Sequence, residues 1–196
     1  MKGTFAHSIT NCTLMSKYQS KLDRLNQDLE SLLAYLSSFP SEKLKEKPSP
    51  TAWSVVEVMQ HLMLAERLSV GYVRKKIQYP HGLKKPGIEN RVRLLLLRFF
   101  MDAPIKFKAP SIVSEQKFSN DVDFETLATK WREIRTEMGK LLNEIPPELQ
   151  DSNIYKHAMA GRLTLDGMFQ FFSGHFNRHR KQIERTLKAV GASRRA

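Results

Sequence analysis

Residues 163–190, which read LTLDGMFQFFSGHFNRHRKQIERTLKAV, decide the fold that we expect for this chain. Two histidines, His175 and His179, fall on the apolar stripe of this stretch, one helical turn apart. Positions i and i+4 of a helix share a face, so both imidazoles point where the apolar side chains point. Buried polar groups need partners, and a metal ion or hydrogen-bonding groups can supply them. The stripe consists of Leu165, Met168, Phe172, Ile183, Leu187 and Val190.

Three further stretches repeat this helical spacing of apolar residues. They cover residues 17–38, residues 54–78 and residues 123–144. Ser54 and Glu57 have the spacing of a capping box at the start of the second stretch. Few segments alternate as strands do. The sequence therefore predicts an all-α fold, a four-helix bundle whose last helix is residues 163–190.

A long connection, residues 79–122, separates the second and third predicted helices. It is long enough to cross the bundle, so these two helices need not be antiparallel neighbours. Within it, residues 91–103 read RVRLLLLRFFMDA and predict a short extra helix that ends before Pro104. A basic amphipathic segment of this kind can lie on a membrane surface. We favour the more ordinary role of a cap packed over the bundle. Residues 40–52 and 146–162 are expected to be loops.

The length of 196 residues, with 41% hydrophobic residues, suits one domain with a sizeable core. We expect residues 1–16 and 191–196 to be flexible tails, since neither shows a clear period. No apolar run approaches the roughly 20 residues of a transmembrane helix. Cys12 is the only cysteine, which excludes an intramolecular disulfide and favours a cytoplasmic location.

The formal net charge is +12. Such an excess can attract nucleic acid, an anionic membrane surface or acidic substrates. The chain shows no organised basic arm and no basic patch interleaved with aromatic residues. We therefore favour a solvated basic surface and do not expect nucleic acid as a partner.

The histidine pair gives the sequence its clearest chemistry. Two imidazoles one turn apart on a helix can bind one metal ion. The motif differs from the HExxH of zinc proteases, because Phe176 follows His175 and no general base stands there. His61, in the second predicted helix, supplies a third nitrogen if the two helices face each other. The sequence thus predicts a divalent metal at His61, His175 and His179, with positions left open. Two hydrogen-bonded core histidines are the alternative.

Two nearby residues have the spacing to support such ligands. Gln182 lies three residues after His179, on the same side of the helix, and Glu57 lies one turn before His61. Each also has an ordinary explanation. Gln182 suits the polar edge of a bundle, and the capping box accounts for Glu57.

Several segments of the chain have counterparts in one family. TAWSVVEVMQHLMLAE, residues 51–66, resembles the second-helix motif of the DinB-like superfamily, and GHFNRHRKQIE, residues 174–184, resembles its last-helix motif. HAMAGRLTLDGMFQFFSGH, residues 157–175, and FKAPSIV, residues 107–113, resemble intervening segments. The likeness runs from about residue 22 to residue 190.

This resemblance implies a four-helix bundle with a long crossover and a divalent metal, nickel or zinc, held by three histidines. The ligands correspond to His61, His175 and His179, and His157 matches a position that often carries histidine near the pocket. A solvated loop histidine is the ordinary alternative for His157. Relatives include metal-dependent transferases of bacillithiol and similar small thiols, and a mycothiol-dependent maleylpyruvate isomerase. Relatives also often form homodimers.

Two functions follow as hypotheses. One is a metal-dependent enzyme that transfers a low-molecular-weight thiol to an electrophile or hydrolyses a small substrate. Its catalytic base is unknown from the sequence. The other is a non-catalytic stress-response or binding module whose metal site is structural or vestigial. Open coordination positions favour the enzyme, whereas a fourth protein ligand favours the structural role.

Overall fold

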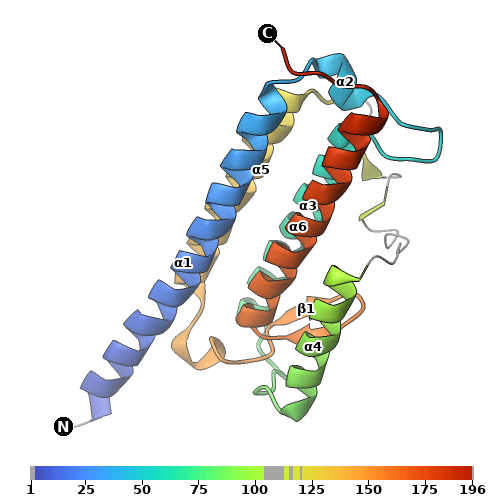
Figure 1. The fold of residues 1–196 in the computed structure, drawn as a ribbon. Coiled ribbons are helices and arrows are strands. Elements are labelled where there is room, and N and C mark those ends of the chain that lie inside the picture. The colour runs from blue at the N-terminus through green and yellow to red at the C-terminus, as the bar shows by residue number, and fades with distance from the viewer. Residues whose placement is uncertain (1–2, 104–112, 115–116, 120, 196) are drawn as a thin grey trace.

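The computed structural model describes residues 3–103, 113–114, 117–119 and 121–195. The protein is mostly helical, which confirms the predicted all-α class (Figure 1). The four long helices are α1 (Gly3–Ser37), α3 (Val55–Gln78), α5 (Phe124–Glu144) and α6 (Leu165–Ala189). None of the described helices is both long enough and apolar enough to cross a membrane.

Side-chain caps start three of the long helices. Ser54 and Glu57 form the predicted capping box of α3: the Ser54 hydroxyl accepts from the Glu57 N–H at 3.2 Å, and the Glu57 carboxylate accepts from the Ser54 N–H at 2.8 Å. Asp123 caps α5 by accepting from the Thr126 N–H at 2.7 Å, and Thr164 caps α6. Each cap satisfies a backbone donor that the helix itself leaves without a partner.

The long helices pack in two opposed pairs. α1 and α6 run toward one end of the molecule, while α3 and α5 run toward the other (Figure 1). α3 packs against both α5 and α6, and α1 packs against the same two helices. α3 and α5 are thus parallel neighbours. Two helices joined by a long connection can be parallel if the connection leads the chain back along the bundle. α4 (Ile88–Asp102), which lies in this connection, runs back in that direction.

All four long helices contribute to the core. Trp131 of α5 and Phe172 and Phe176 of α6 are among its largest fully buried side chains. Leucines of α1 and, mainly, valines of α3 complete it. Each such side chain contributes about 1.5–3 kcal/mol by leaving water, so the core supplies the main driving force for folding.

The structure has elements that periodicity did not predict. A one-turn helix, α2 (Ser41–Lys45), lies in the expected loop 40–52, and a hairpin of β1 (Tyr155–His157) and β2 (Gly161–Leu163) lies in the expected loop 146–162. A short 3₁₀ turn (Pro147–Leu149) precedes the hairpin. Elements of three to five residues are too short for a helical or strand period to register.

Both ends of the chain differ from the simple pattern. α1 begins at Gly3, well before the start near residue 17 that its apolar stripe predicted. Beyond α6, the Arg195 N–H donates to the Ser38 carbonyl at 2.7 Å, and Arg194 lies 5.2 Å from the centroid of the Tyr35 ring. Residues after α6 therefore contact the end of α1.

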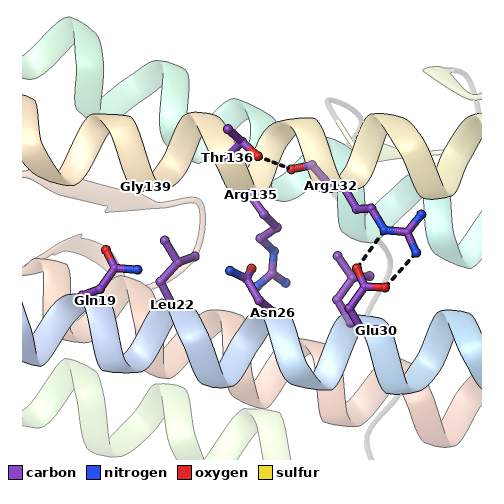
Figure 2. A pocket seen from close by; sticks show the side chains of 9 residues that line it. Gln19, Leu22, Asn26, Glu30, Arg132, Arg135, Thr136 and Gly139 are labelled. Atoms are coloured by element: carbon purple, nitrogen blue, oxygen red, sulfur yellow. Dashed lines mark hydrogen bonds and ion pairs between the residues drawn. The ribbon is translucent and has the colours of Figure 1, made fainter.

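A groove lies between α1 and α5 (Figure 2). Its volume is about 330 Å³. Arg132 pairs with Glu30 across one side, and Arg135 extends toward Asn26. No histidine lines this groove, so it is separate from the site described next.

Candidate metal centre

The packing of α3 against α6 brings the three predicted ligands together. The Nε2 atoms of His61 and His175 are 3.0 Å apart, and one nitrogen from each of His61, His175 and His179 lies within 4.8 Å of the others. The centroids of the His175 and His179 rings are 4.5 Å apart. Among the described residues, no cysteine or carboxylate joins this group. We call these three residues the histidine cluster.

Two neighbours fix which nitrogens face the cluster. The Val113 carbonyl lies 2.8 Å from Nδ1 of His61, and the Gln182 amide oxygen lies 2.9 Å from Nδ1 of His179. Both oxygens only accept, so Nδ1 carries the proton in each ring and Nε2 keeps its lone pair. Gln182 therefore contacts the His179 ring, as its spacing allows, and Val113 contacts the His61 ring in the same way.

The surroundings keep the imidazoles neutral. Burial lowers the pKa of His175 well below its usual value, with the neighbouring His179 and His61 acting in the same direction. Burial also lowers the pKa of His179 to about 3. It lowers the pKa of His61 too, although the hydrogen bond to Val113 opposes this shift. A neutral imidazole is the form that binds a metal, and all three imidazoles of the cluster are in this form at neutral pH.

Aromatic rings wall the cluster on two sides. The Trp53 ring lies 5.1 Å from the His61 ring, and the Phe171 ring stacks on the His175 ring at 4.8 Å. His61 and His175 are buried, whereas His179 is half-buried. Of the three side chains, His179 is therefore the one that solvent reaches most.

Polar contacts hold the crossover near the site. Gln60, next to His61, accepts from the Ser119 N–H at 2.7 Å and donates to its carbonyl at 3.1 Å. Arg178, next to His179, donates to three carbonyls at the end of α4, including that of Ala103 at 2.7 Å. Sequence reasoning did not identify Gln60 or Arg178. In the sequence, their position next to a predicted metal-binding histidine was the only feature that pointed to them.

The remaining predicted residues lie differently. Glu57 does not support His61: one carboxylate oxygen accepts from Ser54 and the other pairs with Lys47 at 2.7 Å, as the capping role requires. His157 is buried in β1 rather than solvated, and its Nδ1 accepts from the backbone N–H groups of Met159 and Ala160.

Phe171 separates His157 from the cluster. Its ring centroid lies 4.4 Å from that of His157 on one side and 4.8 Å from that of His175 on the other. His157 thus belongs to the second layer around the site. Most of the FKAPSIV segment, residues 107–112, lies outside the described residues.

The donor set fits a divalent cation. Bonds of about 2.1 Å from one metal to three imidazole nitrogens place those nitrogens roughly 3.0–3.4 Å apart, close to the 3.0 Å between His61 and His175. Converging lone pairs repel unless a proton or a cation lies between them. Three histidines with carbonyl and amide oxygens behind them form an arrangement that suits zinc, nickel, cobalt or iron(II).

Comparison with known proteins identifies the family of the chain. No curated protein and no solved structure matches the chain. The family model of the DinB superfamily matches residues 24–183, a range that includes α3, α4, α5 and all three histidines. This match covers most of the sequence, and the chain therefore belongs to the DinB superfamily.

Proposed function

We propose that this protein is a metal-dependent enzyme in which Nε2 of His61, a nitrogen of His175 and Nε2 of His179 hold nickel or zinc. The observation that carries the proposal is a three-histidine group that no carboxylate or cysteine of the described chain completes. Catalytic zinc sites commonly have three protein ligands and an open position, whereas structural sites are closed by four.

The residues around the ligands prepare the site. Val113 and Gln182 orient two of the rings. Trp53 and Phe171 limit the access of water on two sides, which strengthens electrostatic interactions at the open position. A bound divalent cation supplies Lewis-acid chemistry, because it lowers the pKa of a thiol or water that it binds.

We favour thiol transfer over hydrolysis as the reaction. A thiol with a pKa near 8.5 needs a far smaller shift to ionise at neutral pH than water, whose pKa is about 15.7. Among the residues that the structure describes, no carboxylate joins the histidine cluster to act as a base for water. The substrate pair is therefore a low-molecular-weight thiol and a small electrophile, in line with the family resemblance.

Metal content is the first test. Protein purified without a polyhistidine tag should contain close to one nickel or zinc per chain by elemental analysis. His61→Ala should lose that metal, whereas the exposed loop histidine of His81→Ala should leave it unchanged. Absence of metal in the native protein, and no binding of added nickel or zinc, would reject the proposal.

Turnover is the second test. Metal-loaded protein should accelerate the reaction of a thiol from a panel with an electrophile, and His61→Ala should abolish this acceleration while His81→Ala retains it. X-ray absorption should show three nitrogen ligands and additional light oxygen ligands. A fourth protein ligand would instead support a non-catalytic module with a structural metal. Turnover that His61→Ala leaves unchanged would reject the metal-dependent mechanism.

A further inference from the structure

α4 is apolar on two opposite faces. One face packs against the bundle, where Leu97 is buried and Leu94 and Met101 join the core. The opposite face is exposed, although a surface helix ordinarily presents polar side chains to water. We call its apolar residues the outer stripe: Ile88 (81% exposed), Val92 (51%), Leu95 (70%), Leu96 (49%) and Phe99 (62%).

The outer stripe is continuous. Ile88, Val92, Leu95 and Phe99 follow one another at intervals of four, three and four residues, so they line one side of the helix over its whole length. Contiguous exposed apolar surface of this kind marks interaction sites, whereas single exposed apolar residues are ordinary. The stripe includes five of the seven large hydrophobic side chains found exposed in the described chain.

Positive charge borders this surface. Arg91 and Arg98 are exposed on the same edge of α4, seven residues apart, and the exposed Lys84 and Lys85 immediately precede the helix. The chain as a whole carries a formal charge of +12. An exposed apolar stripe with arginines along its edge has the composition of helices that lie in the plane of a membrane interface. Arginine side chains there can reach up to lipid phosphates.

We propose that α4 docks this protein on an anionic membrane surface, with the outer stripe in the interface and the arginine edge against acidic headgroups. An antiparallel pairing with a second copy of the chain fits less well. A two-fold axis across the stripe that pairs the helices antiparallel brings the arginine edges of both copies to the same side, where they repel. Anionic lipid complements that charge.

Docking on this face brings the metal centre near the membrane. α4 packs against α6, and Met101 lies against Gly174, the residue before His175. α4 is therefore a direct neighbour of the helix that carries His175 and His179. The docking does not depend on the metal, so the two proposals can be tested separately.

The test is co-sedimentation of the full chain with vesicles of phosphatidylcholine alone, or with about one-third phosphatidylserine. We expect at least tenfold stronger partitioning onto the anionic vesicles, which falls as salt rises. Leu95→Gln/Phe99→Gln should lose binding to both. These side chains are exposed, so thermal unfolding should show that the variant remains folded.

Charge removal provides the matched control. Arg91→Gln/Arg98→Gln should weaken binding to anionic vesicles several-fold. Lys181→Gln/Lys188→Gln removes the same charge at the same spacing from the exposed side of α6 and should change binding much less. Equal losses in the two variants would show that overall charge, rather than α4, governs binding.

Two other outcomes would overturn the proposal. One is binding that the outer-stripe variant leaves unchanged, or binding no stronger to anionic than to neutral vesicles. The other is a dimer, measured by light scattering, that Leu95→Gln/Phe99→Gln converts to a monomer. That result would assign the stripe to a second copy of the chain.

Discussion

α3 carries two buried polar groups that face different helices. His61 meets His175 and His179 of α6, while Glu66 meets Trp131 and Arg135 of α5. We call Glu66, Trp131 and Arg135 the ion-pair cluster. The two clusters lie little more than one turn apart along α3, yet they solve the problem of buried polarity in opposite ways.

Most polar atoms of the ion-pair cluster have their hydrogen-bond partners within the cluster. Arg135 Nη2 donates to Oε1 of Glu66 at 2.7 Å, and Arg135 Nε donates to Oε2 at 2.7 Å. The Trp131 indole N–H also donates to Oε2, at 2.9 Å. Opposite charges and three internal hydrogen bonds make this a structural element. Among the buried atoms described in this cluster, Arg135 Nη1 is the one without a hydrogen-bond partner. Oδ1 of nearby Asn26 also has none (Figure 2).

The histidine cluster has no such match. Its rings are neutral, and the Nε2 lone pairs of His61 and His179 point into the cluster. Within the three rings, only His175 has an N–H that can donate to them. Three ring nitrogens that face one point, with one proton among them, are suited to a cation from outside. The comparison shows how a buried polar group can be assigned: balanced donors and acceptors indicate a structural role, while unbalanced acceptors indicate a ligand.

The largest effect should come from breaking the ion-pair cluster. Glu66→Ala leaves the Arg135 guanidinium buried without its partner and should lower the free energy of unfolding by about 3–5 kcal/mol. Urea unfolding in the presence of a chelator measures this. The double variant Glu66→Leu/Arg135→Met should recover most of the loss, because apolar side chains replace both charges. If the double variant has a free energy of unfolding as low as that of Glu66→Ala, Glu66 and Arg135 do not act mainly as partners of each other.

The histidine cluster should respond to metal instead. Nickel or zinc at a free concentration one hundred times its dissociation constant should raise the free energy of unfolding by about 2.7 kcal/mol. His179→Ala should abolish this increase, whereas Glu66→Leu/Arg135→Met and His81→Ala should retain it. If metal stabilises His179→Ala as much as the parent protein, the ion binds elsewhere.

His157 tests whether the environment that favours neutral imidazoles extends beyond the histidine cluster. Burial lowers its pKa to about 4 from a usual value of 6.5, so the charged ring is favoured in the unfolded chain. The resulting stability is present above pH 6.5 and is lost as the pH falls toward 4. Its share of the loss from pH 7 to pH 5 should be about 2 kcal/mol.

The measurement is urea unfolding of metal-free protein at pH 7 and pH 5. His157→Asn removes the titrating ring and keeps an oxygen that can accept from the Met159 and Ala160 N–H groups. The variant should lose correspondingly less stability between the two pH values. Identical losses in the parent protein and the variant would show that His157 is not the titrating group.

The smallest effect concerns the support of a ligand. Gln182→Leu removes the oxygen that accepts from Nδ1 of His179 and should weaken metal binding about tenfold, or about 1.4 kcal/mol. Gln182→Glu keeps an accepting oxygen and should retain or increase the affinity. Titration calorimetry with nickel or zinc measures both. An unchanged affinity for Gln182→Leu would mean that packing alone holds the His179 ring.

The sequence predicted the long helices and two ligands of the site for local reasons. The capping box at Ser54 and the stripe that leads to His175 and His179 depend on residues within one or two turns, where periodicity is informative. His61 needed the further assumption that α3 faces α6, and the structure confirms that they pack together.

Long-range contacts were beyond that reasoning. Glu66 and Arg135 come from different helices, and nothing in either local pattern marks them as a buried pair. The Val113 carbonyl that orients His61 lies far along the chain, in a segment without periodicity. The hairpin around His157 is stabilised by packing on α3, α4 and α6 rather than by its own short strands.

By itself, therefore, the sequence determined the class of fold and which histidines share a helical face, because both follow from spacing along one helix. Only the tertiary structure decided that the His175–His179 pair meets His61 and is backed by oxygens of Val113 and Gln182. It also decided that α4 buries one apolar face and exposes the other. Which of two similar faces is covered depends on the packing of the whole chain, and helical periodicity does not encode it.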